Sequence, residues 1–431
     1  MTDFKLRERC HVCTNEQNDR FVGIRADAKG AAVFFPMGFQ LSPVSSNENA
    51  LRRDVLQLIL VLSAFAEQKE KLLVMGRNRN PQEAYFPINA YMAIISDYMN
   101  RSYYTETERQ YTAGNTGKIN WLRTIKKHQP LIQRNGSLIY TKFEVYRLKP
   151  NENNMITRIH EYCVYEAFQK LGWLFSSEIP RQPQLELKDN KNMFIGIVRD
   201  KLKHTFIDND KLLFQSMIDM LSYLDENSSE NLFYFGTYNF EYVWERLIDR
   251  VFGVKNKHDY FPRAHWRYLA DGSEYINYPL EPDSIMIPAG MNKIFVLDAK
   301  YYRYGITGNA AHLPPSSSIN KQITYGEFAC VNSKSKEENS VFNAFLMPYN
   351  NTKFDSETAP LGNPLGLTGE YTCAGEAYGE WRKGNLSYET VQGIVADTRH
   401  LMFNYTGNTA RQIKMMADTI ISAYEKHRML G

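Results

Sequence analysis

The alternation of hydrophobic and polar positions divides the first half of the chain into stretches of strand and helix. Residues 21–26 and 30–41 have the composition of β-strands. In residues 51–68, apolar side chains recur at helical spacing, and residues 155–224 are dominated by further helical patterns. These patterns predict a protein in which strands and helices both contribute to the core.

A second group of patterns, further along the chain, has the order helix, strand, strand, helix, strand. The first of these helices carries a continuous apolar stripe, so we expect one side of it to pack on a core. The predicted elements span residues 239–253, 279–287, 293–302, 316–331 and 340–349. This order predicts an α/β fold in which a turn joins two neighbouring strands and helices cover the sheet.

Two carboxylates and a lysine lie on the two strands joined by that turn. Asp283 follows a proline in the first strand, and Asp298 and Lys300 end the second. Because side chains alternate along a strand, Asp298 and Lys300 point to the same face. Two carboxylates can hold Mg²⁺, which offsets charge developing on a phosphodiester, while the lysine orients or activates the attacking water. This is the PD-(D/E)xK nuclease pattern, and it predicts a restriction-endonuclease-like core with a mixed sheet flanked by helices.

The motif is short, and an Asp-Ala-Lys sequence on a strand is also compatible with a solvated strand end. Its surroundings favour the catalytic interpretation. An acidic helix precedes the hairpin, and the hairpin is apolar where burial is expected. The helix that follows places Lys321 and Tyr325 one turn apart, with Gln322 beside them. The combination predicts a hydrolytic site rather than an isolated polar strand end.

The chain resembles the LlaJI family of restriction endonucleases, which is related to McrC-type nuclease subunits, over nearly its whole length. The segments that carry the resemblance are RFVGI, FFPMGFQLS, GKINWLRTIKK, NFEYVWERL, LEPDSIMI, FVLDAKYY, INKQITY and ETVQGIVADTRHLM. The resemblance implies a type II restriction enzyme in which this polypeptide cuts double-stranded DNA. It also implies a separate McrB-like AAA+ GTPase subunit and a cognate methyltransferase, which together defend the cell against foreign DNA such as phage DNA.

The same resemblance assigns roles to individual residues. It gives the two aspartates and the lysine of the hairpin the metal-binding and catalytic places, with Mg²⁺ as the cofactor. Glu241 takes the acidic position of the first helix as a further metal ligand, and Gln322 takes a position that flanks the site. Glu245, one turn further along the helix, is the competing carboxylate, although the distance from Glu241 to Leu247 fits the related pattern better.

Two other functions are compatible with parts of this pattern. A DNA repair or recombination nuclease would share the core and differ in partner and in substrate structure. A non-catalytic DNA-binding subunit of a restriction complex would contain a decayed site, yet every catalytic position carries a competent residue type. Restriction therefore is the favoured interpretation.

The formal net charge of +3 is too small to indicate a nucleic-acid partner, but its distribution is uneven. Residues 101–150 hold ten Lys and Arg residues against three Glu residues, a local net charge of +7. Here a helix from about Asn120 and two strands turning at Asn135-Gly136 resemble a winged-helix arrangement, although a soluble connector would have the same composition. The candidate DNA contacts are Arg123, Lys126 and Lys127, together with Lys321 of the later helix.

A length of 431 residues predicts two domains. We expect an N-terminal α+β domain, residues 1–150, that engages DNA or a partner, and a nuclease domain, residues 151–431. No stretch approaches the roughly 20 apolar residues of a membrane span, and the N-terminus has no apolar signal core. Five cysteines, an odd number, do not indicate a disulfide framework. A bacterial cytoplasmic protein with no membrane partner is therefore expected.

Overall fold

The structure is a computed structural model in which the chain forms two compact units. The first unit contains Met1–Glu83 and Leu232–Gly431, and the second contains Ala84–Asn231. The residues that the structure describes are 6–27, 30–43, 48–66, 86–151, 153–175, 179–183, 190–226, 233–333, 340–351, 363–381, 386–407 and 409–430.

The first unit is built around a five-stranded mixed sheet with the strand order β12-β13-β14-β16-β15. The three central strands are parallel to one another, and the two edge strands are antiparallel to their neighbours. The strands are β12 (Ser284–Met286), β13 (Ile294–Ala299), β14 (Val341–Tyr349), β15 (Tyr371–Tyr378) and β16 (Thr390–Asp397). Every residue of β12, β13 and β14 is buried, which is why these segments are apolar almost throughout.

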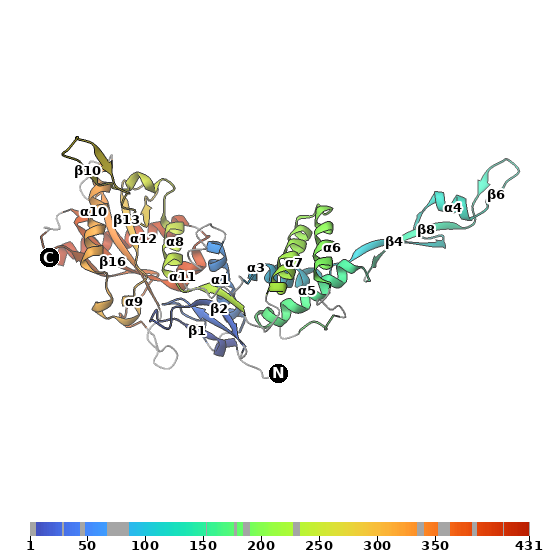
Figure 1. The fold of residues 1–431 in the computed structure, drawn as a ribbon, viewed down its shortest axis with the longest axis horizontal. Helices are drawn as coiled ribbons and strands as arrows, with labels where there is room; N and C mark the ends of the chain where they lie inside the picture. The colour runs from blue at the N-terminus through green and yellow to red at the C-terminus, as the bar shows by residue number, and fades with distance from the viewer. Residues whose placement is uncertain are drawn as a thin grey trace. The chain divides into compact units, whose positions relative to one another are not determined.

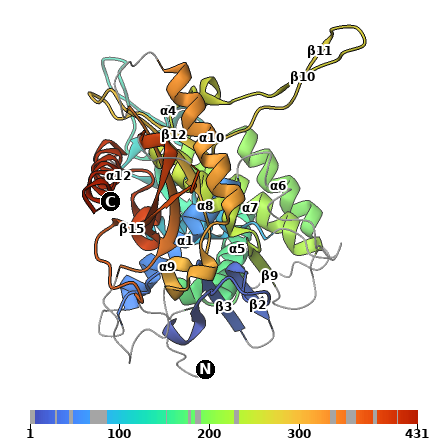
Figure 2. The same cartoon turned by 90° about the vertical axis from the view of Figure 1, so that its left-hand side faces the viewer.

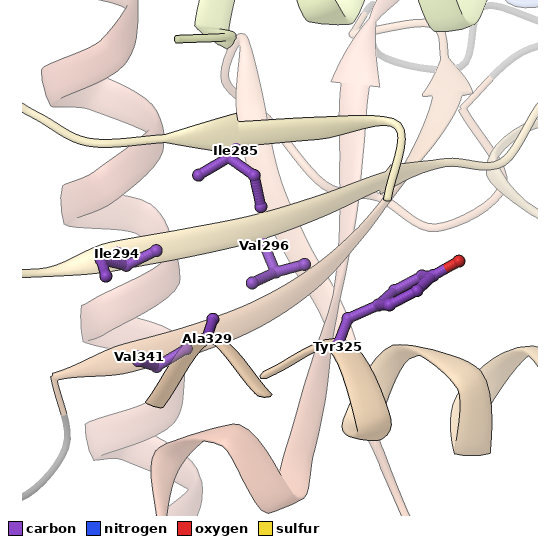
Figure 3. Packing of buried hydrophobic residues seen from close by; sticks show 6 residues of the cluster. All are labelled: Ile285, Ile294, Val296, Tyr325, Ala329 and Val341. Carbon is purple, nitrogen blue, oxygen red and sulfur yellow. The ribbon is translucent and has the colours of Figure 1, made fainter. Parts of the chain in front are cut away.

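Helix α10 (Ser316–Asn332) covers one face of this sheet (Figure 1). Figure 3 shows Tyr325 and Ala329 of α10 packed against Ile285, Val296 and Val341, which come from three neighbouring strands. Burial of a large apolar side chain contributes about 1.5–3 kcal/mol, so this cluster holds the helix firmly against β12, β13 and β14.

Helices α8 (Phe240–Phe252) and α12 (Thr409–Leu430) pack on the opposite face. The indole N–H of Trp244 in α8 donates a hydrogen bond of 3.1 Å to the Leu346 carbonyl of β14. Phe342 of β14 meets Tyr424 of α12 edge to face, with ring centroids 5.5 Å apart. Phe342 follows Val341 in the strand, so the two residues face opposite sides of the sheet.

A second sheet in this unit has the order β1-β3-β2-β9. Its strands are β1 (Cys10–Val12), β2 (Val22–Asp27), β3 (Gly30–Phe35) and β9 (Phe233–Thr237). The Met37 N–H donates to the Tyr301 hydroxyl over 2.7 Å, and Arg399 forms an ion pair of 2.7 Å with buried Asp54 of α1 (Glu48–Ala66). Both contacts tie the first 66 residues to the large sheet. The remaining elements are η1 (Leu6–Arg9), η3 (Lys257–Tyr260), β10 (His265–Arg267), β11 (Glu274–Ile276), α9 (Tyr304–Thr307), η4 (Ala310–His312), η5 (Ser387–Glu389) and α11 (Thr398–Asn404).

The second unit combines a bundle of helices with an extension of two nine-residue strands and several shorter elements (Figure 1). The bundle contains α3 (Ile88–Arg101), α5 (Met155–Leu171), η2 (Gly172–Leu174), α6 (Lys191–Lys203) and α7 (Asp208–Glu226). The extension contains β4 (Glu106–Gly114), β5 (Lys118–Ile119), α4 (Trp121–Lys127), β6 (Leu131–Ile132), β7 (Leu138–Ile139) and β8 (Phe143–Asn151). The predicted helix and hairpin are confirmed: Asn120 caps α4, and β6 pairs antiparallel with β7 across a turn in which Gly136 has a φ of +84°.

The structure divides the chain differently from the predicted boundary at residue 150. That boundary falls inside the second unit, where β8 is hydrogen-bonded along its whole length to β4. The second unit is inserted into the first, because β9 returns to pair with β2 near the start of the chain. Local patterns do not reveal this pairing, since the two strands are separated by the whole inserted unit.

The α/β class and the mixed sheets flanked by helices are confirmed. The predicted sequence of helix, two strands, helix and strand is present as α8, β12, β13, α10 and β14. Within the described part of the chain, no helix is both long enough and apolar enough to span a bilayer.

Candidate active site

The register between β12 and β13 brings the two aspartates together. Ser284 pairs with Leu297, so Asp283, one residue before, and Asp298, one residue after, are cross-strand neighbours. Their carboxyl groups share a hydrogen bond. The Ala299 N–H donates a further bond of 2.7 Å to Asp283 Oδ2, which fixes the orientation of that carboxyl group.

Lys300 completes the group from the first residue beyond β13. Its ammonium lies 2.5 Å from Asp298 Oδ2, and its backbone N–H donates to the Leu346 carbonyl over 2.9 Å. The two side chains are 19% and 12% exposed for Lys300 and Asp298, so the pair is nearly buried yet reachable from solvent. Asp298 has the same parity along the strand as Val296, and therefore lies on the side of the sheet that α10 covers.

Burial and like charge perturb the protonation of this group. Burial, reinforced by the neighbouring charge of Asp298, raises the pKa of Asp283 to about 8. Burial alone would lower the pKa of Lys300, but the ion pair with Asp298 outweighs it and holds that pKa above its ordinary value. At neutral pH the raised pKa of Asp283 therefore favours its protonated form, and Lys300 is an ammonium.

Two glutamates of α8 lie one turn apart near this group. Burial raises the pKa of Glu245, which also responds to the charges of Lys300, Asp298 and Glu241. The charge of Glu245 in turn raises the pKa of Asp283. The charge of Glu241 contributes to the raised pKa of Glu245 and of Tyr301. The electrostatic coupling therefore runs between Glu245 and the aspartate pair.

Helix α10 contributes residues from the opposite side. A hydrogen bond with Tyr325 and the charges of Asp298 and Asp283 raise the pKa of Lys321, whose ammonium lies 5.5 Å from the Tyr325 ring centroid. Gln322 is fully buried, and its Nε2 donates to the Val296 carbonyl over 2.7 Å. Lys321 is thus at the site, whereas Gln322 joins α10 to β13.

Lys257 is a residue of this site that the sequence patterns did not reveal. Its ammonium donates to the Asp283 backbone carbonyl over 2.7 Å and to Asp249 Oδ2 over 2.9 Å. The two bonds connect the end of α8 to the start of β12 and hold Asp283 in place. No local signal marks Lys257, because it lies in the short helix η3, 26 residues before Asp283, and the contact depends on the tertiary fold.

The donor set fits a divalent cation. Asp283 and Asp298 present oxygen donors from neighbouring strands, and a hard cation can replace the proton that Asp283 retains. Within the described residues, no group of three or more His, Cys, Asp or Glu side chains is arranged to hold a metal. A pair of carboxylates is compatible with Mg²⁺, because this ion usually retains several waters.

The other predicted DNA contacts, Arg123, Lys126 and Lys127, lie on α4 in the second unit and are exposed. The Arg123 guanidinium stacks over the Tyr111 ring at 3.8 Å, and Lys127 pairs with Glu144 at 3.2 Å. Their role in DNA binding stays a prediction.

Comparison with known proteins gives a family match and distant structural likenesses. A chain from the tetradecameric assembly of Thermococcus gammatolerans McrB AAA+ hexamers with bound McrC is 15% identical, with a TM-score of 0.34, over 93% of this chain and 83% of that chain. No curated protein matches. The family model described as LlaJI restriction endonuclease matches residues 21–358, which include the aspartate pair, Lys300 and both glutamates of α8. The chain belongs to the LlaJI restriction endonuclease family.

Proposed function

We propose that this chain is the DNA-cleaving subunit of a bacterial restriction system and hydrolyses phosphodiester bonds of double-stranded DNA with Mg²⁺. The observation that carries the proposal is the cross-strand pair of Asp283 and Asp298 with Lys300 at 2.5 Å. In the order of the chain, α8 precedes the strands of the mixed sheet, and α10 lies between β13 and β14. This order supports a PD-(D/E)xK core. Membership of a restriction endonuclease family supports the choice of DNA as substrate.

In this proposal Asp283 and Asp298 hold the cation, which supplies positive charge against the charge that develops on the phosphodiester. Lys300 keeps its proton at neutral pH because its pKa is raised. It therefore orients the attacking water and stabilises negative charge, and does not act as a general base. Lys321, on the other side of the aspartate pair, adds a second positive charge for the DNA backbone.

Glu245 is our choice for the helix carboxylate, in place of the earlier preference for Glu241. Its coupling to Asp283, Asp298 and Lys300 supports a role at the site, either beside the cation or on the attacking water. Comparing Glu245→Gln with Glu241→Gln in a cleavage assay separates the two. We expect the larger loss of rate in Glu245→Gln, and the reverse order would return the role to Glu241.

The restriction system proposed here includes an McrB-like AAA+ GTPase and a cognate methyltransferase, as the family resemblance implies. The function is tested by cleavage of methylated and unmethylated plasmid with Mg²⁺, with and without GTP and the neighbouring AAA+ subunit. We expect cleavage by the wild-type chain and none by Asp298→Ala or Lys300→Ala.

Asp418→Ala, which removes an exposed carboxylate of α12, is the matched control and should cut normally. Circular dichroism establishes that the variants fold. Cleavage by a folded Asp298→Ala variant would contradict the proposed site. Cleavage that depends on GTP and the AAA+ subunit would support the proposed partner. An effect of DNA methylation on cleavage would favour restriction, whereas a preference for branched DNA would favour repair.

A further inference from the structure

A β-hairpin formed by β10 and β11 stands away from the large sheet of the first unit (Figure 2). The two strands are antiparallel, with Trp266 opposite Tyr275 and Arg267 opposite Glu274. The tip is ordered by hydrogen bonds of 2.9 Å from the Tyr268 N–H to the Ser273 carbonyl and from the Gly272 N–H to the Tyr268 carbonyl. An isolated hairpin of this size is only marginally stable in water, so a binding partner would stabilise it.

The hairpin exposes many large apolar side chains. The tip residue Leu269 is 104% exposed, as much as in an extended chain. The other exposed apolar side chains of the hairpin and its base are Trp266, Tyr268, Tyr275, Ile276, Tyr278 and Leu280. Single exposed apolar residues are ordinary, but a contiguous group of this kind marks an interaction surface.

A short chain connection joins the base of the hairpin to Asp283. The Leu280 N–H donates to the Pro262 carbonyl over 2.8 Å and closes the hairpin, and Asp283 follows three residues later. The Tyr325 hydroxyl donates to the Glu281 carbonyl over 3.1 Å, which joins this connection to α10. A duplex with its scissile phosphate at the aspartate pair therefore passes beside the hairpin.

The two faces of the hairpin differ in chemistry. His265 and Arg267 alternate along β10 and so share one face, where Glu274 pairs with Arg267 at 2.6 Å, and Arg263 lies two residues before this strand. Trp266 and Tyr275 are cross-strand neighbours on the other face. The basic side chains suit phosphates, whereas the aromatic rings suit bases. Asp271, at the tip, accepts hydrogen bonds from the backbone N–H and the hydroxyl of Ser273 and so stabilises the turn.

We propose that this hairpin, residues 263–280, inserts into a groove of the double-stranded DNA held at the aspartate pair and that Tyr268 and Leu269 contact its bases. At about 3.3 Å per residue, the hydrogen-bonded arm from Pro262, at the base, to Tyr268, at the turn, reaches roughly 20 Å, more than the depth of either groove. A two-stranded ribbon fits the major groove, and an apolar tip can also wedge between base steps. The inference rests on the proposed function and assigns the hairpin to substrate recognition.

The test is a variant of the full chain with Tyr268→Ser and Leu269→Ser combined. Binding to a plasmid-derived duplex is measured with Asp298→Asn present in every protein, at one fixed salt concentration. We expect the Kd of the tip variant to rise at least tenfold with no change in melting temperature, because both side chains are exposed. Tyr378→Ser with Trp381→Ser, which removes two exposed aromatics of the same unit, is the matched control and should bind normally.

Fluorescence gives a second readout. The chain has five tryptophans, and the DNA-dependent change in emission assigned to Trp266 is the difference between wild type and Trp266→Phe. We expect duplex DNA to quench this contribution through stacking. Unchanged emission, together with an unchanged Kd of the tip variant, would overturn the inference.

The outcomes separate the hairpin from the proposed function. Wild-type cleavage with normal DNA binding by the tip variant overturns the hairpin inference alone. Absence of DNA binding by the wild-type chain overturns both. A tip variant that binds DNA normally but changes its mass in light scattering shows that the hairpin contacts a second copy of the chain, which also contradicts the inference.

Discussion

At the scale of single residues, the site depends on a few contacts that are strong because they are buried. Asp283 and Asp298 are neighbouring carboxyl groups, and burial together with the charge of Asp298 raises the pKa of Asp283. Lys300 and Lys257 act differently on this pair: Lys300 meets a carboxylate, whereas Lys257 holds the backbone of Asp283.

The first prediction concerns stability as a function of pH with a chelator present. The folded-state pKa of Asp283, about 8, lies above its ordinary value of 3.8, so the folded chain retains a proton that the unfolded chain has lost. Between these values the unfolded state binds fewer protons, and the free energy of unfolding falls as pH rises from about 4 to about 8. Denaturant titrations at several pH values measure it, and Asp283→Asn should remove most of this decline. Parallel profiles for the two proteins would show that the folded chain does not retain a proton on Asp283.

A second prediction concerns Lys257. Lys257→Met removes both hydrogen bonds and leaves Asp283 less well held, so we expect cleavage to slow by about 10- to 100-fold, the usual effect of losing a supporting contact at a metal site. The Mg²⁺ concentration for half-maximal rate should rise as well. Lys257→Arg keeps a donor and should recover part of the rate. A variant that loses stability but keeps its Mg²⁺ dependence would indicate a purely structural role.

At the scale of elements, the position of α10 on the sheet determines where Lys321 and Tyr325 lie. Gly326 allows this close approach, because a Cβ there would lie 2.4 Å from the side-chain nitrogen of Asn343 in β14. The fully buried Gln322 bonds to the neighbouring strand. The helix therefore positions the site through its small and polar residues as well as through its apolar ones.

The prediction at this scale is that Gly326→Ala forces α10 away from the sheet. We expect a loss of about 1–3 kcal/mol in the free energy of unfolding, typical of overpacking, and slower cleavage. The matched control is Gly196→Ala in α6, where a Cβ meets nothing within 4 Å. That change should stabilise its helix by about 0.5–1 kcal/mol. Urea unfolding followed by circular dichroism measures both, and equal effects would contradict the close packing of α10.

At the scale of the whole molecule, the first unit is assembled from the two ends of the chain. The pairing of β2 with β9 and the ion pair of Arg399 with Asp54 join residues that are far apart in sequence. Substitutions or insertions in the second unit can leave the core of the first unit intact, because all strands of each sheet belong to a single unit.

This architecture predicts which truncations fold. A chain in which a Gly-Ser linker replaces residues 84–231 should fold, because both of its sheets are complete. A chain that begins at residue 151 should not reach a stable state, since it leaves β9 without β2 and the Tyr301 hydroxyl without its bond from Met37. Thermal unfolding followed by circular dichroism compares the two. A cooperative transition in the second truncation alone would contradict the inserted arrangement.

The sequence by itself determined the individual elements, the spacing of the aspartates and the lysine, and the family. Helical and strand periodicities belong to contiguous residues, so α8, β13 and β14 could be predicted from local patterns, as could the shared face of Asp298 and Lys300. Only the tertiary structure decided the inserted second unit, the anchoring of Asp283 by Lys257 and the coupling of Glu245 to the site. Each of these depends on contacts between elements that are separate in sequence, which no local periodicity encodes.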